Sequence, residues 1–172
     1  WTLSRGLGDV YKRQALEGIS RGIPTPPPGS DLRTAAEWEE IEVLTITMGR
    51  GFNCILKQIA AAASQECRVV IFSEDPNETT SYLTSGTCGG SMSLDSIEVI
   101  DASTNSIWIR DYGANTVYTE WNDGRVLVDW IYNRNRPSDD AIPDVLAQHM
   151  GLDLYTTLEA PLDLMNTGGN WM

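Results

Sequence analysis

Histidine is almost missing from this chain of 172 residues, because His149 is the only one. Most acid–base and metal chemistry needs more than one imidazole, so a histidine-based catalytic or metal centre is not expected from these residues alone. Cysteine is also rare: Cys54, Cys67 and Cys88 are widely spaced and form no CxxC pair. They signal neither a disulfide framework nor a zinc site, although two of them could pair in an exported protein. We therefore expect no metal and no cofactor.

Basic side chains are scarce as well, with 12 Lys and Arg residues against 24 Asp and Glu residues and a formal net charge of −12. That balance argues against nucleic acid or an anionic membrane as a partner, and favours a cationic ligand or simply good solubility. Long apolar runs are missing too, since no stretch approaches the roughly 20 apolar residues of a membrane span. The hydrophobic content of 41% is typical of a soluble globular domain.

The N-terminal part of the chain differs in composition from the rest. Residues 1–14 lack apolar periodicity and resemble the adaptor read-through found at the start of some reading frames, so we exclude them from the fold. Residues 15–34 read as a proline-rich lead-in, extended where four prolines lie within 22–31. Residues 35–172 read as the domain, which looks truncated after its last Gly-Gly pair. Because the true N-terminus is then unknown, no cellular location can be predicted.

Strands and helices alternate along the predicted domain. Strands are expected over 43–48, 67–74, 97–102 and 152–156, and helices over 52–64, 76–83 and 139–150. Two further strands, 116–121 and 126–132, flank an Asn-Asp-Gly turn at 122–124 and predict a hairpin. Asp75 and Pro76 supply a cap and a first-turn proline for the second helix, and Gly151 ends the third. This order predicts an α/β or α+β domain.

Helical spacing also predicts which side chains are buried. In the first helix the residues expected to face the core are Ile55, Leu56, Ile59 and Ala63. In the last helix the residues that share an apolar face are Ile142, Val145, Leu146 and His149. A histidine on such a face is more often a core or boundary residue than a catalyst, so we do not assign His149 a chemical role.

The most unusual stretch is residues 107–113, Ile-Trp-Ile-Arg-Asp-Tyr-Gly, in which an aromatic ring, a cation and a carboxylate interrupt an apolar, strand-like run. A carboxylate accepts paired hydrogen bonds and an aromatic face attracts positive charge, so Trp108 and Asp111 together suit a flat cation such as guanidinium. The alternative is that Trp108 is a core residue and that Arg110 and Asp111 form a surface pair. For both the Trp108 ring and the Asp111 carboxylate to line one pocket, the strand must end or twist between these two residues.

A second group of polar residues follows the hairpin, in Asn-Arg-Asn-Arg-Pro at 133–137. Arg134 and Arg136 are two residues apart, so an extended backbone would point them to one side, about 6–7 Å apart along the chain. Pro137 favours an extended conformation at Arg136. Two guanidinium groups on one side would clamp a carboxylate or phosphate. The alternative is that they pair with the nearby Asp139 and Asp140 or lie in solvent.

Glycines near the end of the chain form a third candidate, Thr-Gly-Gly-Asn at 167–170. Gly168 and Gly169 would let the backbone approach a ligand closely, because glycine has no Cβ, although a tight turn is the more common reason for such a pair. None of the three cysteines has a histidine near it in sequence or an evidently basic surrounding that would activate a thiolate. We nominate none of them as a nucleophile.

These three motifs, taken in order with residues 128–140 as a block, resemble the bacterial peptidylarginine deiminase family, which is related to agmatine deiminase. The segment at 35–39 matches the family's entry into its first strand, and the resemblance covers about residues 26–172. It implies a pentein fold, a five-bladed α/β propeller of ββαβ units, of which this chain would supply roughly the first two blades. It also implies a substrate with a guanidinium group, either a small molecule or a peptide.

The resemblance further implies a role for each matching residue. Asp111 would be the catalytic carboxylate that holds two guanidinium nitrogens, and Trp108 the ring that lines the pocket. The remaining substrate-binding positions would be Arg134 and Arg136 for the carboxylate of a C-terminal arginine, and Gly168 and Gly169 for close passage of the chain. In the family a cysteine thiolate attacks the guanidinium carbon, ammonia leaves, and water hydrolyses the covalent intermediate to citrulline or a carbamoyl product.

Several of the family's functional residues have no match here. Its catalytic histidine, second aspartate and nucleophilic cysteine would lie downstream of the position matching Met172, so we expect this chain to be an inactive N-terminal fragment of the deiminase. Agmatine deiminase, which acts in putrescine synthesis, is the alternative within this chemistry. A non-catalytic binding module that uses Trp108, Trp121 and Trp130 as aromatic surface is the alternative outside it.

Overall fold

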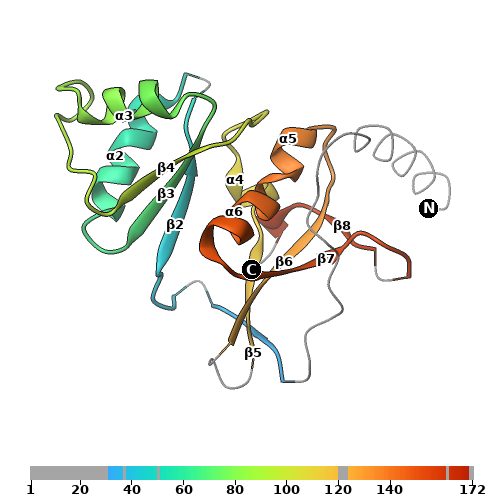
Figure 1. The fold of residues 1–172 in the computed structure, drawn as a ribbon. Coiled ribbons are helices and arrows are strands. Elements are labelled where there is room, and N and C mark those ends of the chain that lie inside the picture. Colours follow the sequence, from blue (N-terminus) through green and yellow to red (C-terminus); the bar gives the residue numbers. More distant parts are fainter. Residues whose placement is uncertain (1–30, 37, 50, 120–123, 162, 171–172) are drawn as a thin grey trace. The chain divides into compact units, whose positions relative to one another are not determined.

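The computed structural model describes residues 31–36, 38–49, 51–119, 124–161 and 163–170 (Figure 1). The chain divides into two compact units, one formed by residues 38–109 and the other by the N-terminal part together with residues 110–172. We call them the three-stranded unit and the five-stranded unit, after the sheet that each contains. The predicted read-through segment, the proline-rich run and the tip of the hairpin at 120–123 lie outside the described residues.

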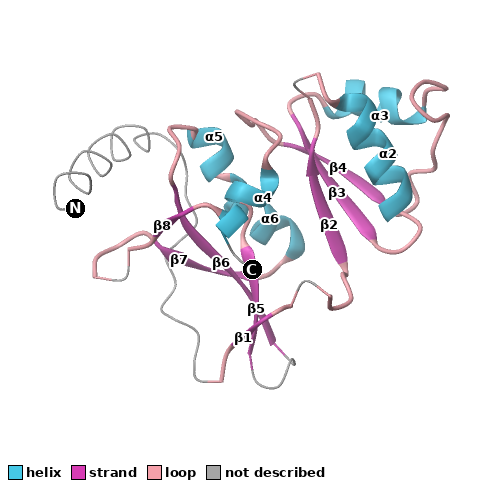
Figure 2. Ribbon diagram, turned by 180° about the vertical axis from the view of Figure 1, so that it is seen from behind, coloured by secondary structure: helices cyan, strands magenta, loops and turns pink. Residues whose placement is uncertain are grey.

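The three-stranded unit is a parallel sheet with two helical connections (Figure 2). Its strands, in spatial order, are β2 (Val43–Thr47), β3 (Arg68–Ser73) and β4 (Ile97–Asp101). Helix α2 (Asn53–Ala63) joins β2 to β3, and α3 (Pro76–Thr84) joins β3 to β4. The central strand β3 contains Val69, Val70, Ile71 and Phe72, all with no exposed surface, which confirms the strand that their nearly continuous apolar run predicts.

The core of this unit is made by apolar side chains from the sheet and both helices: Ile46, Met48, Ala60, Val69, Ile71, Leu83 and Ile97. Leu56 and Ala63 pack against this core, as predicted. The prediction was wrong for Ile55 and Ile59, which are 56% and 44% exposed. Helix α2 turns a different face inward because it buries Lys57, whose charge is met by backbone carbonyls.

Lys57 is 1% exposed, although lysine is almost never buried without partners. Its ammonium group donates hydrogen bonds to the carbonyl oxygens of Tyr82, Ser85 and Thr87 at 2.9, 2.8 and 2.9 Å. These carbonyls lie at and just beyond the C-terminal end of α3, where helical carbonyls lack intrahelical donors. One side chain on α2 therefore closes the end of a neighbouring helix.

A disulfide bond between Cys54 and Cys88 links the same two parts of the unit, with 5.2 Å between the two Cα atoms. Cys54 lies in the first turn of α2, and Cys88 lies in the loop after α3 with a positive φ of 50°. The sequence signals no disulfide because the two cysteines are 34 residues apart and belong to no recognisable spacing pattern. Cys67 is the free cysteine and is half-buried.

The five-stranded unit is a mixed sheet organised on its longest strand, β6 (Gly124–Tyr132). On one side of β6 lies β5 (Asn115–Thr119), which is antiparallel to it and confirms the hairpin, and then β1 (Arg33–Thr34). On the other side, β7 (Asp153–Thr157) is parallel to the first part of β6. Strand β8 (Met165–Asn166) pairs in parallel with the last two residues of β6. The residues that follow β8 thereby lie near the end of β6.

Three short α-helices lie in the described part of this unit. Helix α4 (Ile109–Tyr112) forms where a strand-like run was expected, so that interpretation of residues 107–113 was wrong. The helix expected over 139–150 is two helices, α5 (Pro137–Asp140) and α6 (Ile142–Met150), and each has a proline in its first turn. A proline suits the start of a helix but not its interior, which accounts for the break.

Helix α6 confirms its predicted end and part of its predicted face, since Ile142 is buried and Leu146 packs against buried apolar residues. Gly151 follows it in the left-handed region, with φ 65° and ψ 33°, as a C-terminal glycine should. The buried residues of the helix are Ile142, Pro143 and Ala147. His149 is exposed, so its assignment to a core or boundary position was wrong. Within the described part of the chain, no helix has the length and apolar content needed to cross a membrane.

Candidate functional site

The Gly-Gly pair lies directly against helix α4, although the two are more than 50 residues apart in sequence. The pairing of β8 with the end of β6 brings a short 3-10 helix, η2 (Gly168–Asn170), to this place. A Cβ on Gly168 would lie 2.0 Å from the carbonyl oxygen of Arg110 and 3.1 Å from Cζ2 of Trp130. Since real Cβ atoms essentially never approach so closely, only glycine fits at residue 168.

Gly169 makes the corresponding approach to the candidate carboxylate. A Cβ on Gly169 would lie 2.9 Å from Oδ1 of Asp111. Asp111 lies in α4 and is half-buried, whereas its neighbour Tyr112 is 1% exposed and fixes the helix in the unit. The structure thus brings together Asp111, Gly168 and Gly169, which come from two separate sequence motifs. It also leaves space beside the Asp111 carboxylate, and any larger residue at position 169 would occupy that space.

Tyr132, the last residue of β6, connects the Asp111 carboxylate to the arginine motif at 133–137. Its side chain is 1% exposed, and its ring packs edge-on against that of Tyr112 with 5.8 Å between centroids. Burial raises the pKa of the Tyr132 phenol above its ordinary value of 10.0, and the negative charges of Asp111 and Asp139 raise it further. Arg136 acts in the opposite direction through its positive charge and through a hydrogen bond to the Tyr132 side chain.

The two arginines of residues 133–137 do not lie on an extended backbone. The backbone N–H of Arg136 donates to the carbonyl of Arg134 at 2.9 Å, which closes a tight turn around Asn135. The extended geometry that predicted two parallel side chains was therefore wrong. Arg136 itself has φ −138° and ψ 78°, in keeping with the restriction imposed by Pro137. Arg136 is half-buried and Arg134 is exposed.

The two aspartates that follow the arginines are buried, at 0% exposure for Asp139 and 5% for Asp140. Oδ1 of Asp140 accepts a hydrogen bond of 2.7 Å from the backbone N–H of Tyr132. This bond holds the end of β6 against α5, so Asp140 fixes the backbone at the site. Sequence reasoning missed Tyr132 and Asp140, although both lie within the block at 128–140 that carries the family resemblance. No alternation marks Tyr132, because the buried residues of β6 are Leu127, Asp129, Trp130 and Tyr132, which do not share one face of a regular strand.

Trp108 belongs to the three-stranded unit and lies in the loop before α4. It is 54% exposed, so the alternative interpretation as a core residue was wrong. Its ring lies 6.3 Å from that of Phe52, which is itself 47% exposed. Two large aromatic rings therefore share one accessible area of this unit.

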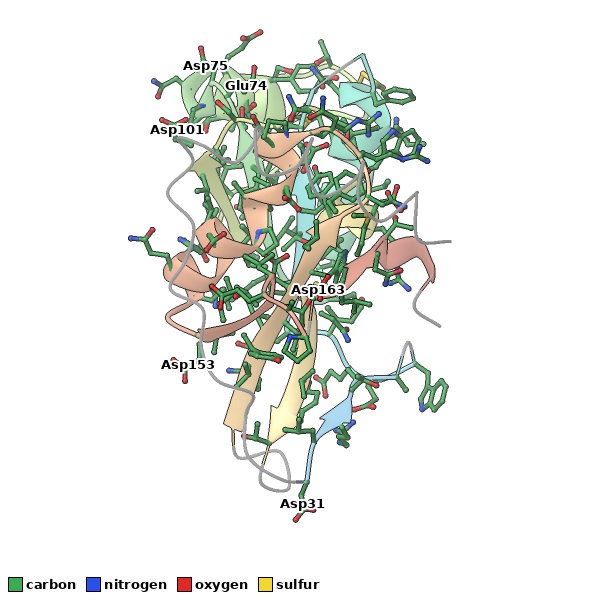
Figure 3. All side chains as sticks on the ribbon, turned by 90° about the vertical axis from the view of Figure 1, so that its right-hand side faces the viewer. Asp31, Glu74, Asp75, Asp101, Asp153 and Asp163 are labelled. Atoms are coloured by element: carbon green, nitrogen blue, oxygen red, sulfur yellow. A yellow bond between two sulfur atoms is a disulfide. The ribbon has the colours of Figure 1, made fainter. Side chains whose placement is uncertain are left out.

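Much of the acidic excess is solvated, and three acidic residues of the three-stranded unit, Glu74, Asp75 and Glu78, line a cavity of about 350 Å³. The acidic residues labelled in Figure 3, Asp31, Glu74, Asp75, Asp101, Asp153 and Asp163, are all exposed. Asp75 uses its carboxylate locally, because Oδ1 accepts the backbone N–H of Glu78 at 2.9 Å as the N-terminal cap of α3. Among the described residues, no group of three or more His, Cys, Asp or Glu side chains is arranged to hold a metal ion.

Solved structures similar to this chain include agmatine deiminase from C. jejuni, with a TM-score of 0.62 and 19% identity over 81% of this chain and 42% of that one. A cysteine-to-serine variant of C. jejuni agmatine deiminase with substrate bound has a TM-score of 0.63 at the same identity and coverage. A Porphyromonas gingivalis protein described as an arginine deiminase has a TM-score of 0.59 and 14% identity, over 73% of this chain and 40% of that one. These structures support the fold, and the chain spans about two fifths of their length.

The match at the level of sequence is to one family. The family model of the Porphyromonas-type peptidyl-arginine deiminase matches residues 36–170, which include α4, the arginine motif and the Gly-Gly pair. The resemblance inferred from the ordered motifs is thereby confirmed, and the chain belongs to the Porphyromonas-type peptidyl-arginine deiminase family.

Proposed function

We propose that the complete protein deiminates a guanidinium group, converting peptidyl arginine to citrulline and ammonia, and that this chain supplies part of the substrate-binding site. The observation that carries the proposal is the approach of the Gly-Gly pair to Asp111, with a virtual Cβ–Oδ1 distance of 2.9 Å at Gly169. The family match supports the same chemistry, because deimination is the activity that the family's name states.

Asp111 is the proposed guanidinium holder. A carboxylate accepts two parallel N–H bonds from a guanidinium group, and such paired, charge-assisted bonds are strong and directional. Asp111 is half-buried, so it is partly shielded from water and still accessible. Gly169 keeps the space beside its Oδ1 open. We retain Trp108 as a proposed substrate-binding ring because of its motif and its exposure.

Arg136 and Arg134 are the proposed ligands for the carboxylate of a C-terminal arginine. Arginine suits that task because its planar fork matches a carboxylate with two parallel hydrogen bonds. Arg136 is the better placed of the two, since it is half-buried and its positive charge is close enough to the Tyr132 phenol to oppose the rise in its pKa. Arg134 is exposed on the other side of the turn at Asn135, so we assign it the weaker share of the binding.

The covalent chemistry needs a thiolate and an acid–base group, and we assign neither role to a residue of this chain. In the proposed reaction the thiolate adds to the guanidinium carbon, ammonia leaves, and water then cleaves the carbon–sulfur bond to release the ureido product and regenerate the thiol. Cys54 and Cys88 are joined to each other, and Cys67 is half-buried at the start of β3. We propose that both groups come from the remainder of the protein, and that this chain covers roughly the first two blades of a five-bladed pentein propeller.

Agmatine deimination is the second candidate, favoured by the fold that this chain shares with the C. jejuni agmatine deiminase. Agmatine has no carboxylate, so Arg136 and Arg134 would have no partner in it. A non-catalytic aromatic binding module is a third candidate, for which the exposed rings of Trp108 and Phe52 are the supporting observation.

The test is ammonia release by the protein of the complete reading frame from three substrates: a peptide ending in arginine, the same peptide with an amidated C-terminus, and agmatine. We expect the free C-terminal peptide to be preferred. Asp111→Asn should abolish turnover of every substrate, whereas Asp163→Asn, at an exposed carboxylate, should leave all of them unchanged. A preference for agmatine would support the second candidate, and ligand binding by this chain alone, without turnover, would support the third.

A further inference from the structure

We propose that Asp140 is a positioning residue for substrate specificity, because it closes residues 133–139 into one conformation before a substrate binds. We call this segment, which carries Arg134 and Arg136, the arginine loop. The inference rests on the proposed function and deepens it, since it concerns which guanidinium substrates the site prefers. The sequence offers Asp140 only as an alternative ion-pair partner for the two arginines, whereas the structure gives its carboxylate a backbone partner.

Asp140 bonds to the chain both before and within the arginine loop. Its Oδ1 accepts the backbone N–H of Tyr132, the residue before the loop, at 2.7 Å. Its own backbone N–H donates to the carbonyl of Arg136 at 3.1 Å. The N–H of Arg136 in turn donates to the carbonyl of Arg134 at 2.9 Å. Both backbone polar groups of Arg136 are therefore bonded, and one residue that is 5% exposed holds the two ends of the loop together.

The bond to Tyr132 takes the place of a neighbouring strand. The N–H groups of the residues on either side of Tyr132 donate to carbonyls at and just before β8. Because successive N–H groups of a strand point to opposite sides, the N–H of Tyr132 points away from β8, and the pairing of β5 with β6 ends at Val128. A buried N–H without an acceptor costs free energy. The Asp140 carboxylate supplies that acceptor at the place where the chain leaves the sheet.

The start of the arginine loop is also bonded to the segment that leads to the Gly-Gly pair. The N–H of Asn133 donates to the carbonyl of Asn166 in β8 at 3.2 Å, and Asn166 lies two residues before Gly168. At the other end of the loop, Pro137 begins helix α5. The backbone of the loop is thus fixed by β8 at its start and by Asp140 and α5 at its end, so its arginines project from a defined turn.

A fixed arginine loop benefits only the substrates that bind to its arginines. Arg134 is exposed and Arg136 is half-buried, and an arginine side chain loses considerable rotamer entropy when a ligand orders it. A backbone that already holds one conformation lowers the further cost of ordering the loop. Agmatine and a peptide with an amidated C-terminus have no carboxylate for these arginines. Asp140 therefore favours a C-terminal arginine over guanidines without a carboxylate.

The experiment compares Asp140→Ala with the wild-type protein of the complete reading frame, by ammonia release. Alanine removes the acceptor of the Tyr132 N–H and keeps the backbone N–H that donates to Arg136. We expect the KM for the free C-terminal peptide to rise about tenfold, the cost of ordering one or two arginine side chains on binding, with kcat within about twofold. The KM for agmatine and for the amidated peptide should stay at the wild-type value.

Leu154→Ala is the matched control for a general loss of stability in the same unit. Leu154 is buried in the apolar cluster of β6, α6 and β7, so its truncation destabilises the unit without touching the arginine loop. The ratios between the three KM values should stay at their wild-type values. If this control shifts them as Asp140→Ala does, the effect is one of stability and the positioning role is wrong.

Asp140→Asn serves as the conservative variant, because an amide oxygen still accepts the Tyr132 N–H but more weakly than a carboxylate. We expect it to restore most of the affinity, with a KM for the free C-terminal peptide about threefold above the wild type and unchanged KM values for the other two substrates. If Asp140→Ala does not fold, this selective threefold rise is the deciding result. Wild-type constants, or an equal rise on all three substrates, would then overturn the inference.

Removal of the arginines tests whether Asp140 acts through them. In an Arg134→Ala/Arg136→Ala background the loop has no guanidinium to position, so adding Asp140→Ala should raise the KM for the free C-terminal peptide no further. A full additional rise in that background would overturn the positioning role. Failure of the proposed function is visible in the wild type instead, as a protein that is inactive on all three substrates.

Discussion

Gly169 approaches Asp111 so closely that a Cβ on the glycine would lie 2.9 Å from the carboxylate oxygen Oδ1. The contact joins two sequence motifs through the pairing of β8 with β6, and it places a residue without a side chain beside the proposed guanidinium holder. The conflict that a larger residue would create involves the end of a flexible side chain. A larger residue at position 169 should therefore disturb the substrate-binding site more than it lowers the stability of the fold.

Gly169→Ala tests that distinction. The new methyl group should push the Asp111 carboxylate aside, so we expect kcat/KM of the complete protein for every guanidinium substrate to fall at least about tenfold, because displaced binding groups lose transition-state contacts. The free energy of unfolding should change by less than about 1 kcal/mol, since the carboxylate can rotate away. Ammonia release and urea denaturation measure the two quantities. A variant that loses stability and keeps activity would show that Gly169 serves the fold only.

Gly168→Ala is the matched contrast one residue earlier. Its Cβ would lie 2.0 Å from the backbone oxygen of Arg110, and backbone cannot rotate away as a side chain can. We expect a loss of about 1–3 kcal/mol in the free energy of unfolding, the usual cost of overpacking. Urea denaturation of Gly168→Ala and Gly169→Ala side by side checks that Gly168→Ala has the lower free energy of unfolding. Equal stability of the two variants would contradict the close approach at Gly168.

The elements that depend on local pattern could be predicted from the sequence. The apolar run of β3, the Asp75 cap of α3 and the left-handed Gly151 after α6 are each encoded within a few residues. Helix α4 could not be predicted, because its four residues are held by the burial of Tyr112 and by the approach of Gly168 to Arg110. These are contacts with residues distant in sequence, and they override a strand-like local pattern.

In the candidate site, too, some features could be predicted from local sequence and others depend on contacts between residues distant in sequence. Motifs identified Asp111, Gly168 and Gly169, but only the pairing of β8 with β6 brings them together. The extended geometry predicted for the arginines failed because residue spacing does not reveal the turn at Asn135. Periodicity also failed at α2, since it assigns Ile59 to the core and cannot show that three carbonyls are available for a buried ammonium group.

Reduction of the Cys54–Cys88 bond should destabilise the three-stranded unit. The bond closes a segment of 34 residues and so restricts the unfolded chain, which predicts a loss of about 2–4 kcal/mol. Urea denaturation with and without a thiol reductant measures it. In a Cys54→Ser/Cys88→Ser variant the reductant should have no further effect. Equal midpoints for the oxidised and reduced wild-type protein would show that the bond contributes nothing to stability.

The pH dependence of stability should carry the signature of Tyr132. Its pKa is raised in the folded protein, chiefly by burial and then by Asp111, so the folded state holds the phenolic proton more tightly than the unfolded state. The stabilisation is fully present below the ordinary value of 10.0 and is lost as the pH rises through the raised pKa. Urea midpoints should fall above about pH 10 in the wild type and fall less in Tyr132→Phe. Identical alkaline profiles would contradict the raised pKa.

Replacement of Lys57 is the last test, and it concerns the buried ammonium group on α2. Lys57→Met keeps the length of the side chain but removes the donor that the carbonyls of Tyr82, Ser85 and Thr87 share. The carbonyls of Tyr82 and Thr87 keep hydrogen bonds from Ser85 and Gly90, so the loss falls mainly on the carbonyl of Ser85, and we expect a cost of about 1–3 kcal/mol. Gln58→Met, at the exposed neighbouring position, is the control and should change stability by less than about 0.5 kcal/mol. If both variants unfold at the wild-type urea concentration, the ammonium group is not what closes the end of α3, and the Cys54–Cys88 bond must hold that loop without it.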